Sequence, residues 1–234
     1  MVVHDLMRLP GFEVLKTYPY GAAVFESSTA RLTVILANRQ PLEEQTGTDL
    51  IYFNETFQSF VMVQYKAMDK KDGEPARFYL SSDKNLPQEI AKMEALASQL
   101  SFCTPNTSHQ GFRLTDNPFF IKLCPRIVFN PEDIGLIPGM YLPLDYWKLL
   151  ETSPDILGVR DGRQITYENV GRYFDNTEFV TVVTKAWVGT TPNQSGVLQD
   201  VIRQTLETGK AVAVAIKSGG SSSGRSSNRG ETIP

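Results

Sequence analysis

Two apolar runs separated by a short polar segment constrain the fold of this chain most strongly. Residues 50–54 read LIYFN and residues 60–66 read FVMVQYK. Aromatic and β-branched residues dominate both runs, which favours strands. If residues 54–58 turn the chain back, the two runs pair as an antiparallel hairpin. The continuous apolar character of residues 60–63 indicates a strand that is buried on both faces.

Polar side chains gather at one end of this predicted hairpin. Asp49 precedes the first run, and Gln64 and Lys66 end the second. Because side chains alternate between the two faces of a strand, Gln64 and Lys66 share one face and Tyr65 points to the other. The hairpin brings Asp49 to within a pair or two of them. A carboxylate, an amide oxygen and an ammonium group are therefore expected to converge, as a divalent metal ion and an attacking water require.

This pattern resembles the PD-(D/E)xK superfamily of metal-dependent nucleases, and within it the Mrr-like restriction endonucleases. In that branch glutamine replaces the usual glutamate of the second motif, which gives Q-x-K. The chain offers Asp49, fourteen intervening residues, and then Gln64-Tyr65-Lys66. The resemblance covers roughly residues 20–100. It implies an α/β, restriction-endonuclease-like fold, in which a mixed β-sheet is flanked by helices and one helix follows the Q-x-K strand.

The family also carries a glutamate on a preceding helix, often within a Phe-Glu pair. The chain offers Phe25-Glu26, twenty-three positions before the motif aspartate. Residues 20–40 lie between two prolines and contain none themselves, and their apolar residues follow helical spacing. A helix is therefore expected over residues 20–40, with Glu26 beside its apolar stripe. A carboxylate there is costly to bury unless it is paired or binds a metal.

Other glutamates compete for this role, and Glu26 also has a purely structural interpretation. At the rim of the stripe it would simply reach water. Phe12-Glu13 is a second Phe-Glu pair that lies much further from the motif. Glu43 and Glu44 lie close to the motif in sequence, although such a position is typical of a loop.

The motif residues have structural interpretations too. Asp49 follows Gly47 and Thr48, a context in which aspartate is typical of a turn that leads into a strand. Gln64 and Lys66 would fit the polar face of an ordinary amphipathic strand. The apolar run before them favours a cleft over a wet surface.

The resemblance implies a role for each residue in phosphodiester hydrolysis with Mg²⁺ or Mn²⁺ as cofactor. Asp49 would be the main charged ligand, supported by Glu26, by the side-chain oxygen of Gln64 and by the backbone carbonyl of Tyr65, because these hard cations prefer oxygen. Lys66 would hold the attacking water or stabilise the pentacovalent phosphate. Since glutamine is neutral, metal binding in the absence of DNA is expected to be weaker than in the D…E-x-K form.

Charge sets a limit on how this chain meets DNA. It carries 23 Lys and Arg against 26 Asp and Glu, a net charge of −3, whereas strong non-specific DNA binding usually needs a basic face. The basic residues in and after the motif alternate with acidic ones over residues 66–92. Weak intrinsic affinity fits an enzyme that depends on a regulatory partner, on a homodimer or on a trigger. It equally fits a protein that does not cut DNA.

Composition predicts a cytoplasmic protein without a membrane contact. No apolar run approaches the roughly 20 residues that span a bilayer, and the N-terminus has no secretory pattern. The two cysteines are not spaced as a zinc site.

Three regions are expected along the chain. Residues 1–125 form the nuclease-like core, residues 126–217 are an α/β extension of the same domain or an accessory subdomain, and the Gly/Ser-rich residues 218–234 are a disordered tail. After the motif, helices are expected over residues 86–100, 141–151 and 196–208, and strands over residues 119–124, 126–129, 178–184 and 211–216.

The sequence therefore predicts a metal-dependent deoxyribonuclease that hydrolyses double-stranded DNA, and the resemblance alone suggests a role in defence against foreign DNA. Two alternatives stay open. One is a nuclease fold that has lost activity and binds nucleic acid or a protein. The other is an effector subunit that is active only within a larger assembly.

Overall fold

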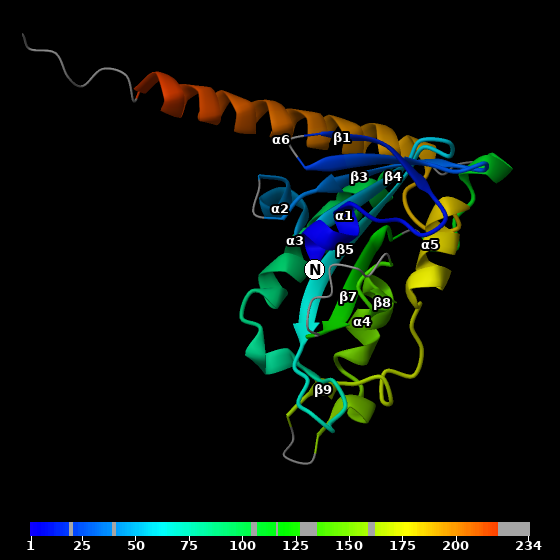
Figure 1. Ribbon diagram of the computed structural model, residues 1–234, viewed down its shortest axis with the longest axis vertical. Coiled ribbons are helices and arrows are strands. Elements are labelled where there is room, and N and C mark those ends of the chain that lie inside the picture. Colours follow the sequence, from blue (N-terminus) through cyan, green and yellow to red (C-terminus); the bar gives the residue numbers. More distant parts are fainter. Residues whose placement is uncertain are drawn as a thin grey trace, which may run out of the picture.

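A seven-stranded mixed sheet with helices on both faces forms the body of the protein (Figure 1). The computed structural model describes residues 1–18, 21–38, 41–103, 107–115, 117–126, 135–158 and 162–219, with side chains up to residue 205. The strand order is β1-β2-β3-β4-β5-β7-β8. In this described sheet β5 and β7 are parallel, and the other neighbouring strands are antiparallel.

The strands of the main sheet are β1 (Glu13–Tyr18), β2 (Ala22–Glu26), β3 (Arg31–Leu36), β4 (Leu50–Asn54), β5 (Ser59–Met68), β7 (Phe119–Pro125) and β8 (Met140–Pro143). A separate ribbon joins β6 (Phe78–Tyr79) to β9 (Gln164–Ile165). The helices are α1 (Val2–Leu6), α2 (Pro41–Thr46), α3 (Leu86–Ser101), α4 (Leu144–Leu150), α5 (Asn176–Thr184) and α6 (Pro192–Gly219), with short 3₁₀ turns at Leu80–Ser82, His109–Gly111 and Pro154–Ile156.

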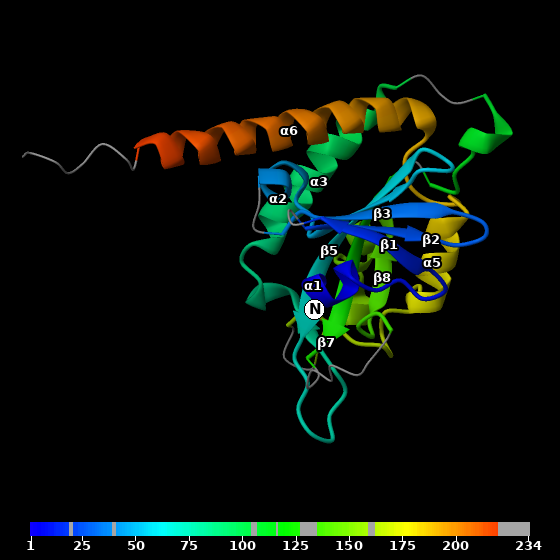
Figure 2. The same cartoon turned by 45° about the horizontal axis from the view of Figure 1, so that its top comes forward.

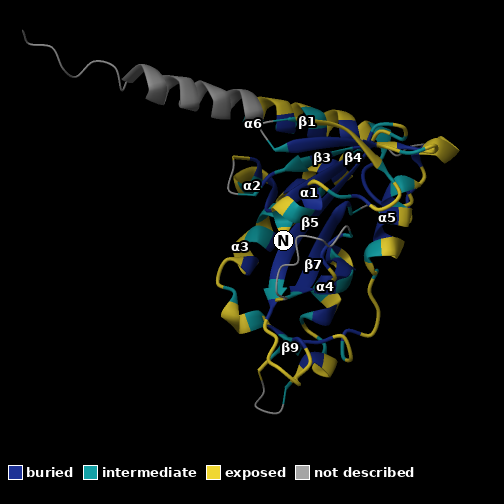
Figure 3. Ribbon diagram, viewed as in Figure 1, coloured by how far each residue is buried: buried dark blue, intermediate teal, exposed yellow. Residues whose placement is uncertain are grey.

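Strand β5 lies at the centre of two hydrophobic cores. Nine of its ten residues are buried, the exception being Ala67, and Figure 3 shows β5 among the buried strands. Phe60 and Met62 pack on one face with apolar residues of α2, α3, α4 and α6. Val61 and Val63 pack on the other face with residues of α1 and α5. Figure 2 shows α3 and α6 on one side of the sheet and α1 on the other.

The hairpin predicted from the two apolar runs is confirmed. Leu50 pairs with Val63 and Asn54 with Ser59 in an antiparallel ladder. The helix expected after the Q-x-K strand is also confirmed as α3, and the strand expected over residues 119–124 is β7. The coarse expectation of a mixed α/β fold with a helix-flanked sheet is therefore met.

The helix expected over residues 20–40 is wrong. The described part of this segment is the β2–β3 hairpin, in which Ala22 pairs with Ile35 and Glu26 with Arg31. A turn at residues 27–30 reverses the chain, held by the Ser27 hydroxyl, which accepts the N–H of Ala30 at 3.2 Å. The spacing of the apolar residues also fits a helix. The two runs pair as strands because aromatic and β-branched residues favour strands.

Four further predictions after residue 125 are corrected. The strand expected over residues 178–184 is helix α5, because Asp175 caps it in a reciprocal capping box with Glu178. The strand expected over residues 211–216 is wrong, and so is the end of the helix expected over residues 196–208, since α6 runs without interruption from Pro192 to Gly219. The segment 141–151 divides into the end of β8 and helix α4.

Two predicted segments fall partly outside the described residues. These are the strand expected over residues 126–129 and the tail 218–234, of which residues 127–129 and 220–234 are not described. The described residues after 135 share the sheet through β8 and share the cores through α4, α5 and α6. Within the described part of the chain, none of the helices combines the length and apolar character needed to cross a membrane.

A fully buried ion pair ties the N-terminal helix to the centre of the sheet. Lys122 on β7 and Asp5 on α1 both have no exposed side-chain surface, and Lys122 Nζ lies 2.7 Å from Asp5 Oδ2. The same carboxylate accepts the Tyr65 hydroxyl at 3.0 Å and the Ile137 N–H at 2.8 Å. Lys122 Nζ also lies 4.6 Å from the ring centre of Tyr141. The charges are therefore buried with several partners, as such a pair requires.

Lys122→Met is expected to destabilise the protein by about 3–5 kcal/mol, because it leaves the Asp5 carboxylate buried without its cation. Denaturation in urea measures the change. The control is Lys148→Met, which breaks an ion pair with Glu94 between side chains that are 40% and 45% exposed, and it should cost at most about 1 kcal/mol. Equal effects of the two variants would contradict the burial of the Asp5–Lys122 pair.

Candidate functional site

Asp49 sits at the start of β4 and is held against β5 by hydrogen bonds. Its backbone N–H donates to the Val63 carbonyl at 2.9 Å. Its carboxylate accepts the backbone N–H of Tyr65 at 2.8 Å through Oδ2 and the side-chain amide of Asn38 through Oδ1. With only 2% of its surface exposed, the carboxylate lies beside the Q-x-K segment, as the hairpin register predicts.

Gln64 and Lys66 share a face of β5, and Tyr65 lies on the opposite face. Tyr65 belongs to the core cluster that packs against α1, and its hydroxyl donates to Asp5. Lys66 reaches the opposite side, toward α3, where its ammonium meets acidic partners. The predicted alternation is therefore confirmed, and only the backbone of Tyr65 can contribute to the Asp49 side of the sheet.

Lys66 is held between two carboxylates. Its Nζ lies 2.9 Å from Asp83 Oδ2 and also forms an ion pair with Glu89, and only 7% of the lysine side chain is exposed. Asp83 has a second role, because its Oδ1 accepts the backbone N–H groups of Asn85 and Leu86 at 3.0 Å each. These are among the free N–H groups at the start of α3. Glu89 follows in the first turn of α3.

Gly47 brings the loop before Asp49 into direct contact with α3. Its φ is +67°, and a Cβ added to it would lie 2.4 Å from the Glu89 carbonyl oxygen. An L-residue with a side chain would therefore meet both backbone strain and a clash with backbone atoms. The close approach sets the start of β4 beside the first turns of α3, which carry Glu89.

Burial first, and then hydrogen bonds and neighbouring charges, shift the pKa values of the acidic groups of the site. Burial raises the pKa of Asp49, and the charge of Glu43 on α2 adds to this, against hydrogen bonds from Asn38 and Tyr65 and the charge of Lys66. Burial likewise raises the pKa of Glu89, with further increases from Asp83 and Asp49, against its interaction with Lys66.

Asp83 differs from these two acids. Burial alone would raise its pKa, but the hydrogen bond and charge of Lys66 and the N–H groups of α3 outweigh burial and lower it. Asp83 therefore keeps its negative charge beside Lys66, whereas burial disfavours the charged forms of Asp49 and Glu89.

Gln64 provides an oxygen with no hydrogen bond from any described residue. Its side chain is 3% exposed, and its Oε1 is buried. A buried polar oxygen without a partner is costly, so such an atom calls for an ion or a water. The pair of Asp49 and Gln64 oxygens on one face matches the oxygen ligands that Mg²⁺ and Mn²⁺ prefer. Among the described residues, no group of three or more His, Cys, Asp and Glu side chains forms a metal site by itself.

The structure does not bring Glu26 to this site. Glu26 pairs with Arg31 at the end of β3 that leads to Asn54 on β4, whereas Asp49 lies at the opposite end of β4. Five strand residues separate the two ends, roughly 17 Å along the sheet. Glu26 is exposed and lies on a strand. The expectation that it lies on a helix is therefore wrong, and so is the expectation that it lies near Asp49.

Two functional candidates escaped the sequence reasoning. Glu89 is a second acid whose charge interacts with that of Asp49. Asn38 orients the Asp49 carboxylate through a hydrogen bond. Glu43 acts on Asp49 through its charge. A signal for Glu89 existed, since a helix that follows the Q-x-K strand and returns to a parallel neighbour begins near the end of that strand.

Gly47→Ala is expected to destabilise the protein more than Gly73→Ala. Both glycines have positive φ, +67° and +76°, but an added Cβ at Gly73 meets no atom within 4 Å. The shared backbone strain costs about 1–2 kcal/mol, and the clash with Glu89 adds to it only at Gly47. Urea denaturation of the two variants measures the difference, and equal losses would argue against the close contact with α3.

Asp49→Asn tests the raised pKa of Asp49. The folded state holds the Asp49 proton more tightly than the unfolded chain does, so the stability gained from it is complete below pH 3.8 and is lost as the pH rises through the folded-state pKa. The free energy of unfolding of the wild type, minus that of Asp49→Asn, should therefore fall as the pH rises above 3.8. Urea denaturation over a pH series measures this difference, and a difference that grows with pH would show that the pKa of Asp49 is lowered in the folded state.

Comparison with known proteins adds no assignment to this site. No protein-family model, curated protein or solved structure matches the chain.

Proposed function

We propose that this protein is a metal-dependent deoxyribonuclease that hydrolyses phosphodiester bonds of double-stranded DNA, as its resemblance to Mrr-like PD-(D/E)xK nucleases implies. One observation carries the proposal. The Asp49 carboxylate, the unpartnered Oε1 of Gln64 and the Lys66 ammonium belong to one end of the β4–β5 hairpin, beneath α3. A helix follows the Q-x-K strand, as the resemblance requires.

The oxygen atoms of Asp49 and Gln64 would hold Mg²⁺ or Mn²⁺. Glu89 would support Asp49, with which its charge interacts, although it lies on the helix after the Q-x-K strand and not on a preceding helix as the resemblance implies. The backbone of Tyr65 is fixed beside the same carboxylate. When bound, the metal would polarise the phosphate and favour attack by water.

Lys66 would stabilise the negative charge that develops on the phosphate. Its ammonium is nearly buried, so its field is weakly screened by water, and a fixed cation is most effective in such an environment. The rigid β5 backbone and the Asp83 carboxylate hold the lysine in place. Asn38 and the Tyr65 N–H keep the Asp49 carboxylate oriented.

A second candidate function is favoured by the state of Lys66. Its ammonium is already engaged by Asp83 and Glu89, so both carboxylates compete with a substrate phosphate. This arrangement suits a nuclease subunit that becomes active only when a partner or the metal draws Glu89 away. The alternative of an inactive binding module differs from both, because it predicts no metal binding at Asp49.

Cleavage of plasmid DNA tests the proposal directly. Purified protein with Mg²⁺ or Mn²⁺ should nick the plasmid, and a chelator should prevent it. Asp49→Ala and Lys66→Ala should each lower the rate about 100-fold or more, because each removes charge stabilisation at the reacting phosphate. Glu26→Ala is the matched control, and it should keep full activity since Glu26 lies at the far end of the sheet.

Manganese binding measured by calorimetry separates the candidates when cleavage is absent. Binding by the wild type that Asp49→Ala abolishes would support the partner-dependent nuclease. An absence of both cleavage and Asp49-dependent manganese binding would reject the nuclease function and leave the binding module.

A further inference from the structure

A charged cleft of about 460 Å³ lies just beyond the end of β5. We propose that this cleft binds the phosphate backbone of duplex DNA beside the site of cleavage, an inference that rests on the proposed nuclease function. The charged residues that line it are Asp69, Lys70, Lys71, Glu74, Arg77 and Arg126.

The cleft is built on an ordered hairpin that continues β5. Asp69 and Arg77 pair through two backbone hydrogen bonds of 2.8 Å each, and the turn closes with the Glu74 N–H on the Lys71 carbonyl at 3.1 Å. Arg126 is attached to the same strand end, because its N–H donates to the Met68 carbonyl at 3.1 Å. Two lysines and two arginines are therefore presented from a scaffold fixed at both sides.

Positive charge exceeds negative charge in this cleft. Among its described residues four cations face two acids, each of which already has a cation nearby: Asp69 lies 3.6 Å from Arg126, and Glu74 lies 3.5 Å from Arg77. Lys70 and Lys71 form no ion pair with a described residue. A polyanion therefore meets a local excess of positive charge on a chain whose net charge is −3.

The larger groove of the protein does not have this property. It measures about 840 Å³ between α2, α3 and α6, and its described lining carries one cation and one acid, Lys92 and Glu44. Size alone would favour this groove as a binding site, but its balanced charge gives a phosphate backbone no attraction. Charge therefore singles out the smaller cleft.

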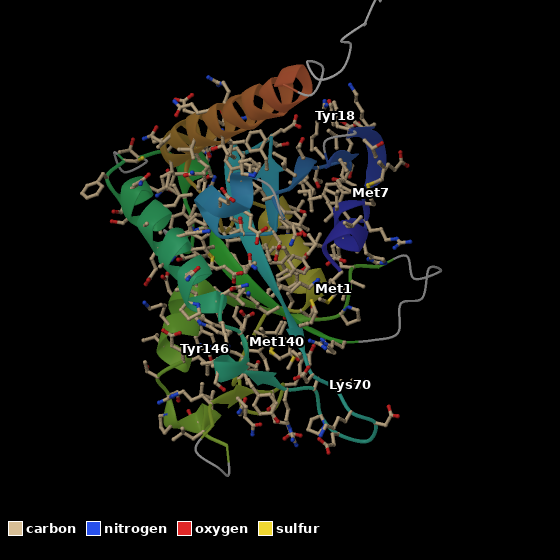
Figure 4. All side chains as sticks on the ribbon, turned by 90° about the vertical axis from the view of Figure 1, so that its left-hand side faces the viewer. Met1, Met7, Tyr18, Lys70, Met140 and Tyr146 are labelled. Atoms are coloured by element: carbon tan, nitrogen blue, oxygen red, sulfur yellow. The ribbon has the colours of Figure 1, made fainter. Side chains whose placement is uncertain are left out.

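The position of the cleft fits a substrate that also reaches Lys66. Figure 4 shows Lys70 on the hairpin that extends beyond β5. Lys70 lies four residues after Lys66, roughly 13 Å along an extended chain. Duplex DNA rises about 3.4 Å per base pair, so the cleft would contact a phosphate roughly four nucleotides from the reacting bond.

The lining favours a duplex over a single strand. Single-stranded nucleic acid is usually bound on several aromatic side chains that stack on its bases. Among the described residues of this lining Tyr79 is the one aromatic residue, and it is 36% exposed. A cleft of cations without a stacking surface fits contacts to the sugar–phosphate backbone, which position a duplex without reading its sequence.

The salt dependence of DNA binding tests this inference. Binding of a short duplex DNA is measured by fluorescence anisotropy at several salt concentrations, with a chelator present so that no cleavage occurs. The double variant Lys70→Gln/Lys71→Gln should bind more weakly at every concentration. The slope of log K against log salt should become shallower by about 1.8, because each lost phosphate contact accounts for about 0.9.

The control is Lys16→Gln/Lys185→Gln, which removes the same charge from two exposed lysines on β1 and just after α5. It should bind DNA with the slope of the wild type. All four lysines are exposed, and Lys16 Nζ lies 4.5 Å from the ring centre of Tyr18, so neither double variant should change the free energy of unfolding by more than about 1 kcal/mol.

Two results would reject the proposal that this cleft binds DNA. Equal slopes for the Lys70/Lys71 variant and the wild type would reject it, while plasmid cleavage by the same wild-type protein would leave the nuclease function standing. An absence of duplex binding by the wild type at the lowest salt concentration would also reject it. The nuclease function would then be decided separately, by Asp49-dependent manganese binding.

Discussion

Burial of β5 on both faces is the constraint on which the rest of this structure depends. A polar side chain on such a strand must find its partner inside the protein, because an unpaired buried charge is too costly. Lys66 finds Asp83 and Glu89 on one side, and Tyr65 finds Asp5 on the other. The contacts of Lys66 at the candidate site and the buried Asp5–Lys122 pair on the other face of the sheet therefore both follow from the burial of β5 and its neighbour. Gln64 is the exception, since its Oε1 has no described hydrogen-bond partner and calls for an ion or a water.

The parts of the fold that local pattern determines could be predicted. Two apolar runs around a polar turn specify the β4–β5 hairpin, and a proline followed by an apolar stripe specifies α3. Residues 20–40 misled because their spacing fits a helix, although the polar turn at residues 27–30 was visible. Residues 178–184 misled because β-branched residues favour strands, yet the capping box of Asp175 and Glu178 was readable and decides the outcome.

The site could be predicted only where the hairpin alone assembles it. Asp49, Gln64 and Lys66 come together because strand pairing fixes their register. Glu89 reaches Lys66 only through the packing of α3, which depends on the absence of a side chain at Gly47. The Asp5–Lys122 pair joins residues 117 positions apart, and no local signal announces such a contact. Tertiary packing therefore places Glu89 beside Lys66 and Asp5 beside the Tyr65 hydroxyl.

Asp83 serves two structures at once, since its carboxylate holds the first N–H groups of α3 and the ammonium of Lys66. Any ligand that draws Lys66 toward itself changes the partner set of Asp83, and by thermodynamic reciprocity the order of the helix start changes the affinity for that ligand. The stability of the first turn of α3 would therefore change when a ligand binds at Lys66. Amide hydrogen exchange at Leu86 would register events at Lys66 without any probe attached to the site.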